Sequence, residues 1–360
     1  MLFKLFITKE SILWPVPVAT KKKKRTLHDR IRVKTLHTLQ RLRQSWAMEK
    51  LRNQTLEVAY SLLEETQFGN PLPSDNTPVR TCIENILTDP DTLDLLARME
   101  KKSPHLRHHA LSCLVLCTRF GQYLGITGQS LHNLALGALL HDVGILNTSS
   151  NTYDKTACIA AGDRRQSETH VLHGPRILAN NPKFWAAIDV ANAHHESVNG
   201  TGYPRKLKGE AIPYNARIVA IVEAYDTMVS SLTHNRDTDS PAQALSVLYR
   251  WMGIKFDQRL VESFIRFLGV YPVGSVVELD SGEVGIVIET KAFHLMMPKI
   301  ALVLDNKGHK IAPEVIDLYQ EKVDLKEGKH RIIKALQNNK YNIDISNIIK
   351  KNKYRRDRQP

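Results

Sequence analysis

The residues of this chain that could do chemistry gather between positions 141 and 223. His and Asp adjoin at 141 and 142, directly after an apolar helical run, and further imidazoles and a carboxylate follow along the chain. Neutral imidazole and carboxylate are common ligands of first-row divalent metals, and a carboxylate can bridge two such ions. This combination predicts a two-metal hydrolytic site. Its candidate members are His141, Asp142, His170, His194, His195 and Glu223.

Two helices are expected to deliver the acids of this cluster. The run 131–140 is apolar almost all round, which predicts a buried helix whose stripe reaches Asp142. A carboxylate on a buried face is costly unless it is paired or bound to a metal. We expect Gly144 to end this helix as a left-handed cap. A later helix over 213–230 places Glu223 on its inner face with Asp226 one turn on, which again indicates a cation.

Further histidines extend the cluster. A helix beginning near residue 104 carries His109 on an apolar stripe, with His105 one turn earlier. A single His on such a face is usually a hydrogen-bonded core residue, but His109 becomes a candidate ligand if the later cluster lies beside it. His194 and His195 point roughly 100° apart around a helix, so both reach one site only near a helix end or at a broad cavity. The segment 199–204 predicts a glycine-rich turn just after them.

In this order and spacing, the residues resemble the HD-GYP family, bacterial HD-superfamily proteins that hydrolyse cyclic di-GMP. The resemblance covers about residues 80–320 and includes the segments GYPRKLKGEAIPYNARI and YPVGSVVELDSGEVGIV. It implies a mainly α fold, an HD-superfamily helical bundle with a small C-terminal antiparallel β unit. We therefore expect an N-terminal segment with a basic helix (1–78), a helical metal-binding domain (79–270), a small β extension (271–320) and a basic helical or disordered tail (321–360).

The resemblance also implies the cofactors and the reaction. It implies two divalent metal ions, iron or manganese before nickel or zinc, and attack of a metal-bridging hydroxide on the phosphorus of cyclic di-GMP. The product would be the linear dinucleotide, GMP or both. Asp142 and His141 would be catalytic, and His105 is a candidate ligand of a third ion. The first ion would lie on His109, His141, Asp142 and Glu223, and the second on Asp142, His170, His194 and His195.

Four departures from the family pattern concern the substrate pocket. Ile145 stands where a Lys commonly follows the His-Asp pair, Glu223 replaces an Asp, and Asn199 replaces another Asp. Residues 231–236 replace a segment of the Ser-Asp-Arg-Pro-Tyr-Arg type. Each lost charge-assisted contact costs roughly 1.5–3 kcal/mol. The alternatives are therefore a catalytically weak receptor or scaffold that binds metal and cyclic dinucleotide, and an HD phosphohydrolase for another nucleotide. The family pattern assigns substrate binding to Gly202, Tyr203, Pro204, Arg217 and Arg236.

Charge and composition limit the partners. The formal net charge is +13, but residues 21–52 carry +10 and residues 350–358 carry +5, so the rest of the chain sums to −2. The basic helix 21–52 is expected to dock to the body, to form a homodimer or to contact a protein or an anionic surface, whereas a nucleic-acid polymer is not expected as a partner. No run approaches the roughly 18 apolar residues of a membrane span. Four cysteines without a C-x-x-C pair fit a reducing cytoplasm.

Overall fold

The protein is described by a computed structural model over residues 27–66, 77–148, 168–230, 240–290, 294–325, 330–337, 341, 343–345 and 347–349. The chain divides into two compact units, Met1–Glu49 and Lys50–Pro360. Helix α1 (Leu27–Thr66) includes the residues on both sides of that division. Its last turns belong to the second unit, because Ala59 and Leu63 are buried in the core of that unit. The compact body therefore begins before the boundary predicted at residue 79.

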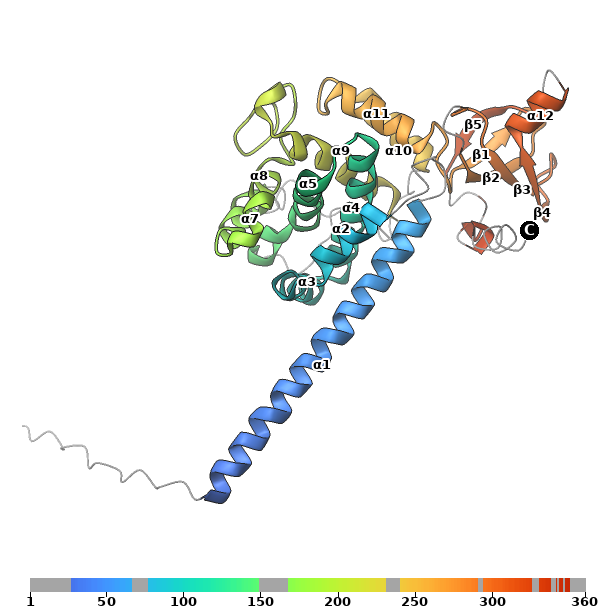
Figure 1. The fold of residues 1–360 in the computed structure, drawn as a ribbon. Coiled ribbons are helices and arrows are strands. Elements are labelled where there is room, and N and C mark those ends of the chain that lie inside the picture. Colours follow the sequence, from blue (N-terminus) through green and yellow to red (C-terminus); the bar gives the residue numbers. More distant parts are fainter. Residues whose placement is uncertain are drawn as a thin grey trace, which may run out of the picture. The chain divides into compact units, whose positions relative to one another are not determined.

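Helices form most of the second unit (Figure 1). Helix α2 (Thr77–Leu87) ends before Asp89, whose side chain accepts hydrogen bonds from the backbone amides of Asp91 and Thr92 and so caps α3 (Pro90–Lys102). The helices and 3-10 turns that follow are α4 (Pro104–Tyr123), α5 (Gly128–Leu140), η1 (Val143–Asn147), α7 (His170–Leu178), η3 (Pro182–Phe184), α8 (Trp185–Ala193), η4 (Gly209–Ala211), α9 (Tyr214–Val229), α10 (Pro241–Arg250) and α11 (Gln258–Leu268).

Helices α4 and α5 are the centre of the helical body, because they contribute to two apolar clusters. Leu111 and Leu139 lie in a cluster with residues of α2 and α3, whereas Cys113 and Phe120 lie in a cluster with residues of α9, α10 and α11. Helix α4 packs on α5 and α9, and α5 also packs on α8. The buried run predicted over 131–140 is confirmed, since α5 is buried along most of its length. Packing from both sides holds the helices that carry the first candidate ligands.

A five-stranded antiparallel sheet follows the helices, in the order β4-β3-β2-β1-β5. The predicted mainly α fold with a C-terminal β unit is therefore confirmed. The expected helical or disordered tail from 321 is wrong over Ile332–Leu336, which pairs with Val276–Leu279 at the edge of the sheet. The strands are β1 (Val276–Leu279), β2 (Val284–Glu289), β3 (Lys299–Leu304), β4 (Lys310–Asp317) and β5 (Ile332–Leu336), and α12 (Leu318–Leu325) lies between the last two in sequence.

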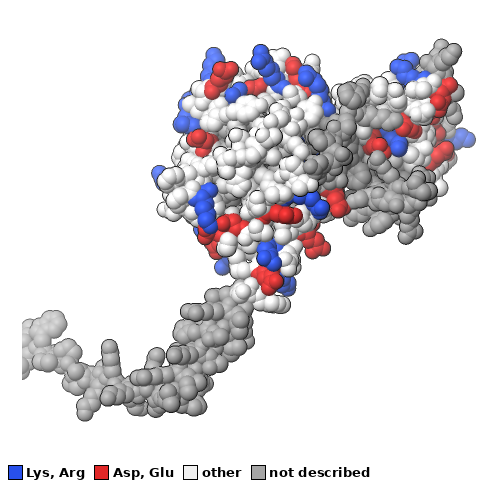
Figure 2. Space-filling view, viewed as in Figure 1, with Lys and Arg blue, Asp and Glu red and all other residues white. Residues whose placement is uncertain are grey.

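The surface of the helical body carries charges of both signs. On the face shown in Figure 2, Lys and Arg lie interspersed with Asp and Glu, and neither sign forms one continuous patch over the described residues. This agrees with the small net charge that the sequence leaves to the chain outside its basic ends. Within the described parts of the chain, we find no helix with the length and apolarity needed to cross a membrane.

Candidate metal centre

Asp142 lies at the centre of the cluster and faces imidazoles on two sides. It follows α5, whose C-cap residue is His141, and only 1% of its surface is exposed. Its Oδ2 lies 3.4 Å from the Nε2 of His141. Its Oδ1 lies 3.3 Å from the Nε2 of His170 and 3.6 Å from the Nε2 of His194. The two oxygens of one carboxylate therefore address two different groups of nitrogen donors, which is the arrangement of a bridging ligand.

Close backbone packing brings His170 to Asp142. Gly144 lies within η1 and does not have a positive φ, so the predicted left-handed cap is wrong. A Cβ atom at Gly144 would instead lie 2.0 Å from the carbonyl oxygen of His170 and 2.5 Å from the backbone nitrogen of Gly174. Glycine is needed here because the backbones of η1 and α7 touch. This contact places the first residue of α7 beside the turn that carries the central acid.

Backbone carbonyls orient two of the imidazoles. The Nδ1 of His141 lies 2.7 Å from the carbonyl oxygen of Ala138, and the Nδ1 of His194 lies 2.9 Å from that of Val190. A ring nitrogen that donates to a carbonyl leaves the other nitrogen, Nε2, as an acceptor that can bind a metal. In both rings this Nε2 faces Asp142. The helices that carry these histidines thus set the ring orientation as well as the position.

The carboxylate of Asp226 orients the third imidazole. The Oδ2 of Asp226 lies 2.6 Å from the Nδ1 of His109, and Ser112 donates a hydrogen bond to the other oxygen. His109 and Asp226 are both buried. The sequence indicated a cation from the buried Glu223 with Asp226 one turn on, and the structure places the Asp226 carboxylate against the ring of His109. Its spacing of three residues from Glu223, on the inner face of α9, was the available signal.

The seven predicted ligands come together in two overlapping groups of donors. Within each group the donor atoms all lie within 4.8 Å of one another. Such a set of imidazoles and carboxylates suits first-row divalent metals. Burial lowers the pKa of His195 well below its ordinary value, although Glu223 opposes this shift, and the neutral ring is the form that binds metal. One group is Asp142, His170, His194 and His195, and the other is His109, His141, Asp142 and Glu223.

Two residues near His109 differ from the expectation. His105 is exposed and belongs to neither group of donors, so the structure does not support its predicted role as ligand of a third ion. Cys113, which the sequence did not indicate as a candidate ligand, lies with its Sγ 3.7 Å from the Nε2 of His109. It forms a third group of candidate donors with His109 and His141. Its spacing of four residues from His109 on an apolar stripe was the sequence signal.

The Gly-Tyr-Pro segment forms one edge of the site. The ring of Tyr203 stacks on that of His195 with a centroid distance of 4.9 Å, and its backbone amide donates to the His195 carbonyl. A Cβ at Gly202 would lie 2.3 Å from the backbone nitrogen of Ser197. Glu196, buried and not assigned from the sequence, accepts hydrogen bonds from the backbone amides of Arg205 and Leu207, just after Gly-Tyr-Pro, at 2.7 and 2.9 Å. The loop is therefore fixed against the histidine pair.

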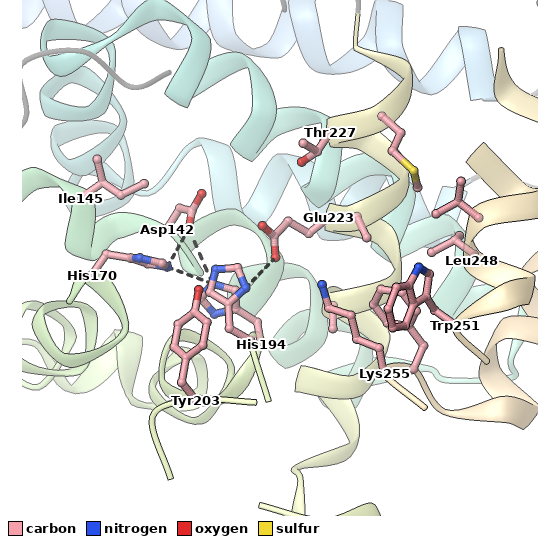
Figure 3. A pocket seen from close by; sticks show the side chains of 16 residues that line it. Asp142, Ile145, His170, His194, Tyr203, Glu223, Thr227, Leu248, Trp251 and Lys255 are labelled. Atoms are coloured by element: carbon pink, nitrogen blue, oxygen red, sulfur yellow. Dashed lines mark hydrogen bonds and ion pairs between the residues drawn. The ribbon is translucent and has the colours of Figure 1, made fainter. Parts of the chain in front are cut away.

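A cavity of about 510 Å³ opens beside the donors (Figure 3). Ile145 lines it at the position where the family pattern has a Lys. Arg217 is not among the lining residues, and its guanidinium pairs with Asp257 at 2.7 Å, so its contact with substrate stays a prediction. Arg236 lies outside the described residues. The lining residues are Asp142, Ile145, His170, His194, His195, Tyr203, Ala220, Glu223, Ala224, Thr227, Met228, Val247, Leu248, Trp251, Lys255 and Phe256.

Comparison with known proteins identifies the domain that contains the site. Residues 94–260 match the family of the HD domain. A cyclic di-GMP phosphodiesterase of Pseudomonas aeruginosa is 27% identical over 236 residues, which are 65% of this chain and 56% of that protein. A 3'3'-cGAMP-specific phosphodiesterase of Vibrio cholerae is 30% identical over 130 residues, 36% of this chain and 28% of that protein. The chain thus spans about half, or less, of the length of these relatives.

Among solved structures, a protein of Bdellovibrio bacteriovorus described as HDG"Y"P is similar to this chain. The sequence identity is 21%, and the TM-score is 0.40. The alignment covers 60% of this chain and 69% of that one.

Proposed function

Residues 94–260 form an HD domain of the HD-GYP type, and on that premise we propose that this chain is a metal-dependent phosphodiesterase that hydrolyses cyclic di-GMP. The observation that carries the proposal is the position of Asp142, whose carboxylate belongs to both groups of donors. Such a site would hold one cation in each group of donors, with Asp142 as a ligand common to both. Two such cations are what an in-line displacement at phosphorus requires.

The side chains of the site have separate tasks in this reaction. Bound divalent ions lower the pKa of water and polarise phosphate oxygens. Asp142 would be the ligand common to both cations. His141 and His194 present their Nε2 atoms because backbone carbonyls accept hydrogen bonds from their Nδ1 atoms. Asp226 fixes the ring of His109. These orienting bonds exist before substrate binds, so little reorganisation accompanies the reaction.

The cavity and its edge suit a cyclic dinucleotide. A volume of about 510 Å³ lies in the range of small-molecule sites. Tyr203 stacks on His195 and so stands where the cavity meets the donors. We propose that Gly202, Tyr203 and Pro204 contact the substrate, as the resemblance implies. The cyclic dinucleotide named for the relative from Pseudomonas aeruginosa supports cyclic di-GMP as the substrate.

Two divalent ions are proposed as the cofactors, with iron or manganese first and nickel or zinc as the alternatives. Imidazole suits iron, nickel and zinc, whereas carboxylate suits manganese. The thiol of Cys113 is a soft donor at the edge of the group that contains His109 and His141. A soft donor favours iron or zinc over manganese in that group.

Two other functions have a specific observation in their favour. Ile145 lines the cavity where the family pattern has a Lys, which favours a receptor that binds metal and nucleotide but turns it over slowly. The specificity for 3'3'-cGAMP named for a relative from Vibrio cholerae favours a different cyclic dinucleotide as the substrate.

One experiment separates these functions. The protein is purified anaerobically, its metal content per chain is measured, and turnover of cyclic di-GMP and 3'3'-cGAMP is followed beside an Asp142→Ala variant. We expect two ions per chain, hydrolysis of cyclic di-GMP and loss of both in the variant. Metal with nucleotide binding but no turnover favours the receptor. Turnover that survives Asp142→Ala refutes the metal mechanism, and Asp91→Ala, an exposed acid outside the site, is the control.

The remaining parts of the chain are proposed to serve attachment. We propose that the helix within residues 21–52 forms a homodimer or contacts a protein or anionic surface. We also propose that the protein works in the reducing cytoplasm, and the free thiols of the three described cysteines support that compartment. Deletion of residues 1–49, the first compact unit, is expected to leave intrinsic turnover intact and to change the molar mass or the surface binding. Light scattering and vesicle sedimentation measure these two outcomes.

A further inference from the structure

The cavity has a second wall, formed by the turn between α10 and α11. Trp251 and Lys255 of this turn line the cavity together with the apolar side chains of Met228, Leu248 and Phe256. In Figure 3, the Lys255 side chain lies between Glu223 and Trp251. Trp251 remains 48% exposed, so its ring is accessible to a ligand. Nothing in the proposed metal chemistry uses this wall.

Backbone hydrogen bonds hold this turn rigidly. The amides of residues 254, 255 and 256 all donate to the carbonyl oxygen of Trp251, and the amide of Gly253 donates to that of Phe256 at 2.8 Å. Gly253 has φ +73°, a conformation that favours glycine. The two side chains therefore project from a compact turn with a defined backbone.

The same turn is tied to the segment that follows the histidine pair. The amide of Val198 donates to the carbonyl of Lys255, and the amide of Asn199 donates to that of Ile254, both at 3.1 Å. Val198 lies three residues after His195. The distance from the Trp251–Lys255 wall to the metal donors is thus fixed by main-chain bonds, as a binding site for one ligand that spans both would require.

The charges of the cavity point to what this wall binds. Among the described residues, Lys255 is the single Lys or Arg that lines the cavity. Ile145 removes the cation expected beside the His-Asp pair, and Arg217 is occupied by Asp257. A diester with two phosphates needs a cation for the phosphate that is not attacked, and Lys255 is in place to supply it. An exposed indole beside a cation is a suitable platform for a stacked base.

We infer that Trp251 and Lys255 form a subsite for the nucleotide remote from the metals, with the purine stacked on Trp251 and the non-scissile phosphate paired with Lys255. This inference rests on the proposed function, because it assigns the second half of the same cyclic dinucleotide. It makes this wall a determinant of affinity and specificity, separate from the metal centre. In this chain a phosphate would thus be bound by Lys255, in the turn after α10, and not at position 145, after Asp142.

Binding and turnover of cyclic di-GMP by variants test the subsite. We expect Trp251→Ala to weaken binding about tenfold or more, and Trp251→Phe to restore most of it, because any aromatic ring can stack. Lys255→Met is expected to raise KM about tenfold or more with a smaller change in kcat, and to reduce the salt dependence of binding. Tyr249→Ala and Lys208→Met remove an exposed aromatic residue and an exposed cation that do not line the cavity. They are the matched controls and should change little.

Two further readouts separate the subsite from a structural role. Bound cyclic di-GMP should quench tryptophan fluorescence in the wild-type chain, and Trp251→Phe should lose this quenching while it keeps most of the affinity. Hydrolysis of bis(p-nitrophenyl) phosphate, a diester without a purine, should be unchanged in all variants. Loss of that activity in Trp251→Ala or Lys255→Met would show that the substitution disturbs the metal centre and would overturn the inference.

The failure of the subsite and the failure of the proposed function give different results. If the wild-type chain binds but does not hydrolyse cyclic di-GMP, the proposed function fails, and the subsite is still judged by the losses of affinity in Trp251→Ala and Lys255→Met. If cyclic di-GMP does not bind, the same titrations are made with 3'3'-cGAMP and cyclic di-AMP. Binding of none of the three, or equal binding by the wild type and both variants, overturns the subsite.

Discussion

Replacement of Asp226 by Asn tests whether this buried acid orients a metal ligand. The Asp226 Oδ2 is 2.6 Å from the Nδ1 of His109, and Ser112 holds the other carboxylate oxygen. Asn has nearly the same shape, so the side chain can keep its place while it loses the negative charge. The imidazole then loses the charge-assisted bond that fixes its ring and raises the basicity of its Nε2. Asp226→Asn should therefore weaken metal binding without removing a ligand.

The size of this effect follows from the kind of contact. Loss of a carboxylate that orients a ligating His reduces metal affinity or activity 10- to 100-fold, or about 1.4–2.7 kcal/mol. The loss should concern one ion only, because Asp226 contacts His109, which belongs to the group with His141 and Glu223. Competition of the purified protein with a metal chelator measures the affinities of the two ions separately. In Asp226→Asn, the metal affinity of the group that contains His170 should be unchanged.

Two results would refute this reasoning. Unchanged affinity for both ions in a folded Asp226→Asn variant would show that the hydrogen bond to His109 is irrelevant to binding. Loss of metal as complete as in Asp142→Ala would show that Asp226 is itself a ligand. The control is Asp257→Asn, which removes the charge of a partly buried acid paired with Arg217 and is expected to leave both metal affinities intact.

Three further predictions concern the framework of the site. Gly144→Ala should lower the free energy of unfolding, measured by chemical denaturation, by about 1–3 kcal/mol, because its new Cβ would meet backbone atoms. Gly174→Ala should lower it by less, because the nearest atom to its Cβ belongs to a side chain. Glu196→Gln should raise KM for the cyclic dinucleotide more than it lowers metal content, because the acid accepts hydrogen bonds from the backbone directly after Gly-Tyr-Pro. Burial raises the pKa of Cys82 from 9.0 to about 11. The unfolded thiol therefore ionises first, stability should fall as pH rises from 9 to 11, and Cys82→Ala should flatten that fall.

The residues of the metal centre could be predicted from the sequence because their types and order carry the information. Apolar runs predicted the buried helix that ends near Asp142 and the helix that carries Glu223, and the structure has α5 and α9 at these places. The resemblance to the HD-GYP family added His109, which periodicity alone would assign to the core. The structure gathers all seven proposed ligands within two donor groups. Local pattern and family spacing sufficed for this part.

Contacts between distant segments could not be predicted in the same way. The pairing of Asp226 with His109 joins residues 117 positions apart, and that of strand β5 with β1 depends on an edge that only the folded sheet provides. Gly144 was assigned to a helix cap because a glycine after a helix usually has that role. Its true constraint, the backbone of α7, lies on another element. The sequence gives a residue's chemistry more readily than its partner.

Helix α9 shows why the metal centre and the substrate wall can change separately. Glu223 and Asp226 lie one turn apart on it, so a single rigid element supplies one proposed ligand and orients another, His109. Substitution within this element would disturb both at once. Lys255 and Trp251 instead stand on a turn that main-chain bonds hold, so their side chains can vary without moving a ligand. A chain with Ile145 in place of the family's Lys can therefore bind the phosphate through Lys255 instead, while its metal donors keep their positions.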